Sequence, residues 1–286
     1  MDVIAVVGAG VMGVDVAATA AFHGYSVILK DIVPQVLSEA PQIIRRNIRN
    51  YKMVSSTLQN WNTADILSRI TFTDRYEGFE KASWVIENTI EDFDVKRTLY
   101  GELREVCSPD AIFAINTSCI SITKLAALLP QPERVVGMHF MNPVPLKEAV
   151  ETVKGFHTSD EIVQSSETFL KSLNKKAILV QDYPGFVSNR LSHLFMNEAA
   201  FLVQDQVAEP KQIDDIFKFG YAHKMGPLET ADLIGLDTVV RSLDVLYQSY
   251  QDTKFRCCPL LRKMVDAGLL GRKSGRGFYT YQLGGV

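Results

Sequence analysis

The segment that most constrains the fold of this chain is its N-terminus, where a glycine pattern separates two apolar runs. Val3–Val7 is short, β-branched and unbroken, which is typical of a parallel strand buried on both faces. The residues GAGVMG at positions 8–13 follow directly and match the pattern G-x-G-x-x-G. An Ala- and Val-rich stretch, Val11–His23, predicts a helix, and Tyr25–Leu29 predicts the next strand. Together these segments indicate one βαβ unit within about 30 residues.

Each position of this pattern has a physical role in dinucleotide binding. Gly8 permits the tight turn, Gly10 has no side chain to block a pyrophosphate, and Gly13 allows helix and strand to pack closely. The helix N-terminus offers free N–H groups to the phosphates. Asp31, eighteen residues after Gly13, can accept hydrogen bonds from ribose hydroxyls and would repel a 2′-phosphate, which favours NAD over NADP. The predicted cofactor-binding residues of this segment are Gly8, Gly10, Val11, Met12, Gly13 and Asp31.

The bulk composition excludes several classes of protein. The chain has 286 residues, 47% of them apolar, which suits a protein of two globular domains. A formal net charge of −3 gives no general attraction to nucleic acid or to anionic lipid. No apolar run reaches the ~18 residues of a membrane span, and the N-terminus has no secretory pattern. The four cysteines have no metal-ligand spacing, so we expect no metal site and a reducing, cytoplasmic location.

The order of apolar runs predicts two domains of different class. Strand-like and helix-like stretches alternate up to Ala177–Val180, which indicates a doubly wound sheet. After Tyr183-Pro184-Gly185 the patterns are helical, for example in Asn189–Gln204 and Asp237–Tyr250. We therefore expect an α/β chain, with a Rossmann-type NAD-binding domain over 1–183 and an all-α domain for substrate binding and dimerisation over 184–286.

Three polar clusters follow predicted strands or open the second domain. They are the residues NTSC at 116–119, HFMNP at 139–143 with Glu151 on the next strand, and PGFVSNR at 184–190. Ligands of open α/β sheets bind beyond the carboxyl ends of the strands, which is where the first two clusters lie. His139 is the one histidine at such a strand end, and an imidazole is a side chain suited to proton transfer near neutral pH. A carboxylate such as Glu151 can fix the tautomer of an imidazole.

From the residues alone, each of these side chains also has a structural interpretation. His139 can be a histidine that caps its strand, and Ser118 can cap the helix that follows it. Glu151 can be a surface residue, and Asn189 can have only a helix-capping role.

The motifs taken together resemble those of the short-chain L-3-hydroxyacyl-CoA dehydrogenase family, which includes the bacterial 3-hydroxybutyryl-CoA dehydrogenases. The similarity covers nearly the whole chain. It includes GAGVMG, VIEN with Glu91 and Lys96, NTSC, HFMNPVPL, VE, PGFVSNR, MGPLETADLIGLD and GRKSGRGFY. The resemblance implies oxidation of a 3-hydroxyacyl thioester, or reduction of a 3-ketoacyl thioester, with NAD as the cofactor.

The resemblance also implies roles for individual positions. His139 is similar to the family's catalytic base, and Glu151 to the carboxylate that orients it. Ser118 and Asn189 resemble the residues that bind the substrate oxygen and position the thioester. Three further residues are expected at the cofactor site: Glu91, Lys96 and Asn116. Glu91 and Lys96 are expected on its nicotinamide side. The second domain is the dimer interface of the family, so a homodimer is expected.

The chain departs from the family pattern in several places. Cys119 replaces a usual serine, and Asp15 stands where a small residue is common. The stretch 221–224 is bulkier and more basic than usual, and we expect it to change the shape of the acyl pocket. The predicted helix Val36–Met53 lacks the lysine–glycine–lysine turn that is frequent in the region contacting CoA. This helix has four basic residues, Arg45, Arg46, Arg49 and Lys52. They are candidate contacts for the carrier of the acyl group, which is CoA or an acidic acyl carrier protein, or they form only a solvated helix face.

Other functions share parts of this pattern. A flavin enzyme can have the same glycine pattern, but no second flavin-type motif is present. A β-hydroxyacid dehydrogenase acting on a free acid usually relies on a catalytic lysine, which the His139–Glu151 pair disfavours. A third alternative is a structural relative that binds NAD without catalysis. The same thioester chemistry serves fatty-acid breakdown, butyrate formation and polyketide-like biosynthesis on an acyl carrier protein, and the sequence does not choose among them.

Overall fold

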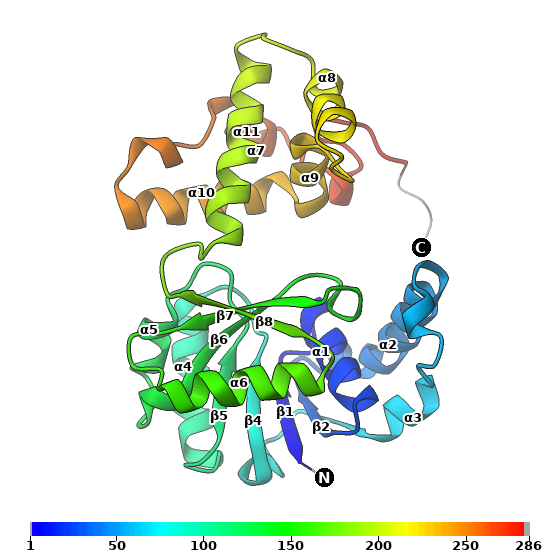
Figure 1. Ribbon diagram of the computed structural model, residues 1–286, viewed down its shortest axis with the longest axis vertical. Coiled ribbons are helices and arrows are strands. Elements are labelled where there is room, and N and C mark those ends of the chain that lie inside the picture. The colour runs from blue at the N-terminus through cyan, green and yellow to red at the C-terminus, as the bar shows by residue number, and fades with distance from the viewer. Residues whose placement is uncertain (1, 283–286) are drawn as a thin grey trace. The chain divides into compact units, whose positions relative to one another are not determined.

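The computed structural model describes residues 2–282 and divides the chain into two compact units, Met1–Tyr183 and Pro184–Val286 (Figure 1). The first unit is an α/β structure built on one sheet, and the second is helical. The α/β fold class with a helical C-terminal part is thereby confirmed.

The sheet of the first unit has eight strands in the order β3-β2-β1-β4-β5-β6-β7-β8. All neighbouring pairs are parallel except β6 and β7. The order reverses direction beside β1, which is the switch point where doubly wound sheets bind ligands. In chain order the strands are β1 (Val3–Val7), β2 (Ser26–Lys30), β3 (Ile70–Thr73), β4 (Ala82–Glu87), β5 (Ile112–Ile115), β6 (Val135–Phe140), β7 (Ala149–Lys154) and β8 (Lys176–Gln181).

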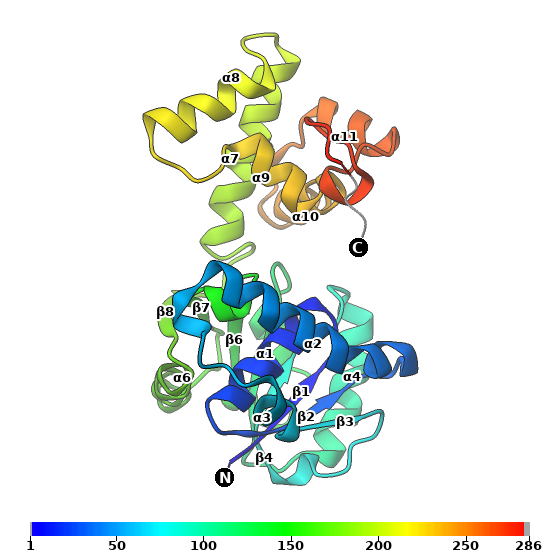
Figure 2. The ribbon, with the colours of Figure 1, turned by 90° about the vertical axis from the view of Figure 1, so that its right-hand side faces the viewer.

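Helices cover both faces of this sheet. One face packs against α1, α2 and α6, as shown by the stacking of Trp84 in β4 on Phe169 in α6. The other face packs against α4, where Tyr100 meets Phe113 of β5. Figure 2 shows α2 running beside α1. The helices are α1 (Val11–Phe22), α2 (Pro34–Val54), α3 (Thr63–Ser68), α4 (Phe93–Val106), α5 (Ile122–Ala126) and α6 (Asp160–Ser172), with short 3₁₀ turns η1 (Ser56–Leu58), η2 (Phe79–Lys81), η3 (Pro132–Arg134) and η4 (Val144–Leu146).

The second unit packs its helices around an apolar core and two buried carboxylates. Asp214 accepts hydrogen bonds from the start of α9, and Asp232 accepts them from the C-terminal backbone at Phe278 and Tyr279. Both carboxylates are fully buried and therefore tie distant segments together. The elements are α7 (Ser188–Gln204), α8 (Pro210–Asp215), the π-helix η5 (Ile216–Gly220), α9 (Pro227–Ile234), α10 (Leu236–Tyr250), η6 (Thr253–Phe255), α11 (Pro259–Asp266) and η7 (Arg272–Ser274).

Two expectations for local structure need correction. The polar residues 55–69 predict a single helix, but the chain turns at Gln59 and Asn60, and the side chain of Asn62 then caps a new helix. The residue pattern of Pro210–Phe219 likewise predicts one helix, but the chain changes there from α to π geometry at Ile216. Within residues 2–282, no helix is long and apolar enough to cross a membrane. The same residues contain no cluster of three or more His, Cys, Asp or Glu side chains arranged to hold a metal ion.

Candidate active site

The glycine turn joins β1 to α1 with very little free space. Gly8 has a φ of +94°, and a Cβ there would lie 2.7 Å from the carbonyl oxygen of Asn88. A Cβ on Gly13 would lie 1.7 Å from the carbonyl oxygen of Gly8, so neither position accepts a side chain. A Cβ on Gly10 would meet nothing within 4 Å. The turn is therefore closed toward the protein and open above Gly10, which fits a pyrophosphate at the start of α1.

Asp31 follows β2 and reaches back to this turn. Its Oδ2 accepts a hydrogen bond of 2.7 Å from the amide of Ala9, and its Oδ1 accepts one of 2.9 Å from Val33. A pocket of about 280 Å³ opens beside it. The carboxylate thus lies between the predicted pyrophosphate position and this pocket, which fits an adenosine ribose. The pocket is lined by Val7, Gly8, Lys30, Asp31, Ile32, Tyr76, Thr89, Val95, Thr98, Leu99 and Glu102.

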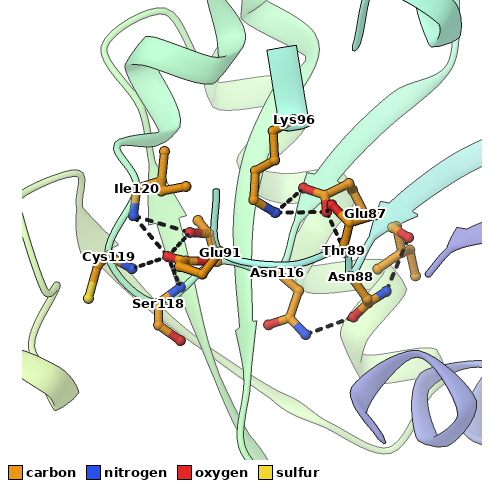
Figure 3. A network of polar contacts seen from close by, with 11 residues as sticks. Glu87, Asn88, Thr89, Glu91, Lys96, Asn116, Ser118, Cys119 and Ile120 are labelled. Carbon is orange, nitrogen blue, oxygen red and sulfur yellow. Dashed lines mark hydrogen bonds and ion pairs between the residues drawn. The ribbon is translucent and has the colours of Figure 1, made fainter. Parts of the chain in front are cut away.

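Lys96 forms a buried ion pair at the end of β4. Its Nζ donates to both carboxylate oxygens of Glu87, at 2.7 and 2.6 Å, and neither side chain is appreciably exposed (Figure 3). Glu87 Oε1 also accepts hydrogen bonds from the amide and hydroxyl of Thr89. The pair therefore fixes the backbone turn at residues 87–89, which packs against the glycine turn. A direct contact between Lys96 and nicotinamide stays a prediction.

Glu91 organises the segment that carries Ser118. Its Oε1 accepts hydrogen bonds from the hydroxyl of Thr117 and from the amides of Ser118, Cys119 and Ile120, at 2.6 to 3.1 Å (Figure 3). A carboxylate that accepts several amide hydrogen bonds holds its loop rigidly. Cys119 takes part through its backbone, so its replacement of serine leaves this arrangement intact. The predicted contact of Glu91 with the cofactor is not excluded by this role and stays a prediction.

Asn116 links the ends of three neighbouring strands. Its Nδ2 donates to Asn88 Oδ1 at 2.7 Å, and its Oδ1 accepts from the amide of Phe140 at 3.1 Å. These bonds connect the carboxyl ends of β4, β5 and β6 at the edge where ligands are expected.

The three side chains predicted to carry the chemistry of the first unit form one hydrogen-bonded chain. His139 in β6 and Glu151 in β7 are directly paired in the antiparallel register. His139 Nδ1 lies 2.9 Å from Glu151 Oε2, and its Nε2 lies 3.2 Å from the hydroxyl of Ser118. Both His139 and Glu151 are more than nine-tenths buried. In this geometry the carboxylate favours the tautomer with a proton on Nδ1.

The loop between β6 and β7 is held from two sides. The ammonium of Lys175 donates to the carbonyl oxygens of Val144 and Lys147, both at 2.7 Å. Burial lowers the pKa of Lys175 to about 8. On the other side, the loop packs against α1, where the buried carboxylate of Asp15 accepts hydrogen bonds from Tyr51 and Asn47 in α2. The unusual Asp15 is therefore satisfied by α2 and fixes that helix against α1.

The predicted carrier residues lie on the solvent side of α2. Arg45 and Arg49 are exposed, and Lys52 is half-buried near the end of the helix. A shallow groove of about 590 Å³ runs along this face and is lined by Glu39, Gln42, Ile43, Arg45, Arg46 and Arg49. Asn189 lies in the second unit, in the first turn of α7, where its carbonyl oxygen meets Nδ1 of the buried His193. Its role as a substrate contact stays a prediction.

The fold and the geometry of the site define the class of protein to which this chain belongs. A glycine turn with a carboxylate after β2, beside an imidazole–carboxylate pair at the same sheet edge, is the arrangement of a dinucleotide-dependent oxidoreductase.

Comparison with known proteins gives the family. Residues 3–183 match the model of the 3-hydroxyacyl-CoA dehydrogenase NAD binding domain, and residues 185–281 match the C-terminal domain of the same enzymes. The chain therefore belongs to the 3-hydroxyacyl-CoA dehydrogenase family and is an NAD-dependent oxidoreductase.

Individual members of the family are similar to this chain over nearly the full length of both sequences. A probable 3-hydroxybutyryl-CoA dehydrogenase of Bacillus subtilis is 41% identical over 98% of this chain and 97% of its own. The 3-hydroxybutyryl-CoA dehydrogenase of Bradyrhizobium diazoefficiens is 41% identical over 98% and 95%. The crystal structure of (S)-3-hydroxybutyryl-CoA dehydrogenase from Ralstonia eutropha has a TM-score of 0.91 at 36% identity and covers 99% of both chains.

Sequence reasoning missed several residues of this site. Glu87 ends an apolar strand and has Lys96 nine residues later, and a charge in that position is a signal for a buried ion pair. Lys30 ends the apolar strand β2 in the same way, directly before Asp31. Tyr76 and Glu102, which also line the pocket beside Asp31, have no such signal.

Proposed function

We propose that the enzyme interconverts 3-hydroxyacyl-CoA and 3-ketoacyl-CoA, with His139 as the acid and base. The observation that carries this proposal is the hydrogen-bonded chain from Ser118 through His139 to Glu151. An imidazole that is oriented by a carboxylate and faces a hydroxyl can exchange a proton with an alcohol or ketone oxygen. The printed names of the relatives support a short 3-hydroxyacyl thioester as the substrate.

In the oxidising direction, Nε2 of His139 takes the proton of the substrate's 3-hydroxyl group as C3–O becomes a carbonyl. NAD, when bound, supplies the acceptor for the hydride that leaves C3. Glu151 stabilises the imidazolium through the Nδ1–H bond, because the pair is shielded from water. Ser118 donates toward the substrate oxygen, and Glu91 holds its backbone in place. In the reducing direction His139 returns the proton to the ketone oxygen.

The exposed basic face of α2 is compatible with either of two candidate carriers of the acyl group. Arg45, Arg49 and Lys52 suit the phosphates of CoA, which is our first choice given the names of the relatives. The same groove suits an acidic acyl carrier protein, which is the second candidate.

We expect rapid NADH oxidation with acetoacetyl-CoA and turnover at least about 10-fold slower with the same group on an acyl carrier protein, as judged by kcat/KM. The measurement is the loss of NADH absorbance with each substrate at matched concentrations. Turnover on the carrier protein alone would contradict the CoA assignment and make α2 a protein-docking surface. NADH binding without turnover of either substrate would contradict catalysis itself.

We also propose that the enzyme is a homodimer joined through its second unit. That unit leaves several large apolar side chains exposed, among them Leu191, Phe219 and Tyr221. A stable dimer needs an apolar surface of this kind. Sedimentation velocity is expected to show twice the mass of one chain, and a concentration-independent monomer would contradict the proposal.

A further inference from the structure

Lys30 is a buried ammonium with an unusual environment. It is the last residue of β2, and only 2% of its surface is exposed. Its Nζ lies 4.2 Å from the centre of the Tyr76 ring. Among residues 2–282, no carboxylate lies within ion-pair distance of this Nζ and no oxygen accepts a hydrogen bond from it. Because this charged side chain is buried except where it lines the pocket beside Asp31, its Nζ is a candidate for contact with a ligand in that pocket.

The ring beneath Lys30 is held in place by a second residue. The hydroxyl of Tyr76 donates to the carboxylate of Glu102 in α4. Burial and this carboxylate raise the pKa of Tyr76, so the ring stays a neutral phenol. A neutral ring face attracts an ammonium through its quadrupole. The contact therefore orients the Nζ but leaves its N–H groups without an acceptor.

Lys30 and Tyr76 line the pocket that also contains Gly8 and Asp31. The rest of its wall is mainly apolar, with Ile32, Val95 and Leu99 among its residues. Such a pocket suits a flat aromatic group that has hydrogen-bond acceptors at its edge. The adenine base of NAD has ring nitrogens of this kind, and Asp31 is placed for the ribose attached to it.

We propose that Lys30 recognises the adenine base of the cofactor, with its Nζ donating a hydrogen bond to a ring nitrogen. This inference rests on the NAD dependence of the enzyme and not on the identity of the acyl substrate. It makes Lys30 a specificity residue for the adenosine half of NAD, in addition to the ribose contact expected of Asp31.

The test compares ligands that contain or lack the base. Lys30→Met keeps the length of the side chain and removes the charge. We expect it to weaken binding of NADH and of AMP by at least about 10-fold, because a hydrogen bond from a charged group is lost. Binding of reduced nicotinamide mononucleotide, which lacks adenine, is expected to be unchanged. NADH fluorescence titration and competition by the two mononucleotides give these values.

The control variant is Lys81→Met, which makes the same change at an exposed lysine of η2 and is expected to leave all three affinities unchanged. Wild-type affinity for AMP in Lys30→Met would overturn the proposal. An equal loss for both mononucleotides would also overturn it, because the charge would then act on phosphate and not on the base.

A second measurement needs no variant and covers the case in which Lys30→Met does not fold. Analogues of AMP in which one ring nitrogen at a time is replaced by C–H are titrated against the wild-type enzyme. At least one deaza analogue is expected to bind about 10-fold more weakly than AMP, and that analogue identifies the nitrogen. Equal binding of every analogue would refute the hydrogen bond.

Discussion

Replacing His139 by Gln is expected to lower kcat at least about 10²-fold and to leave NADH binding intact. Gln can still donate its amide protons toward Glu151, so the buried carboxylate keeps a partner and the fold is preserved. What the variant loses is a group that changes its protonation state at Nε2. Without it the substrate proton must pass to water or to Ser118, whose hydroxyl lies 3.2 Å from the imidazole and is a far weaker base.

The measurement is steady-state NADH oxidation beside a fluorescence titration of NADH, with circular dichroism to verify folding. His157→Gln provides a matched control, since His157 is exposed and lies outside the hydrogen-bonded chain. Near-normal turnover by the His139 variant would show that another group moves the proton. A parallel loss of NADH affinity would mean that His139 supports the cofactor site and that its role in proton transfer is unproven.

The pairing of His139 with Glu151 could be predicted from the sequence, because it depends on two strands that follow each other along the chain. His139 and Glu151 each lie in an apolar run, and the loop between the runs is too short for a helical crossover. Two such strands pair as antiparallel neighbours, which brings the two side chains together. The glycine turn and Asp31 were predictable for the same reason, since one βαβ unit contains all of their geometry.

Other parts of the site depend on contacts that no local pattern specifies. Glu91 was expected beside the cofactor, but the hydroxyl and the three amides that donate to it come from a segment 26 to 29 residues later. Asp15 looked like an unexplained departure until Tyr51 and Asn47 were seen to bind it from another helix. The turn at Gln59 and Asn60 was missed because a polar stretch without glycine has the same composition as an exposed helix.

The ion pair of Lys96 and Glu87 leads to the largest expected change in stability. Lys96→Met leaves Glu87 fully buried without its cationic partner, although Thr89 still donates hydrogen bonds to it. Removing one member of a buried pair costs about 3–5 kcal/mol, because the remaining charge is uncompensated. For a domain of this size we expect Tm to fall by roughly 10 °C.

The double variant with Lys96→Met and Glu87→Gln separates two explanations of such a loss. If the uncompensated carboxylate is the cause, neutralising it restores most of the stability, since Gln still accepts the hydrogen bonds of Thr89 through its amide oxygen. Thermal unfolding followed by circular dichroism, with Lys81→Met as the exposed control, measures each step. Equal Tm values for the single and double variants would instead assign the loss to the packing of the lysine stem between β4 and α4. In that case the position of the turn at residues 87–89, which contacts Gly8 of the glycine turn, would depend on apolar contacts and not on the ion pair.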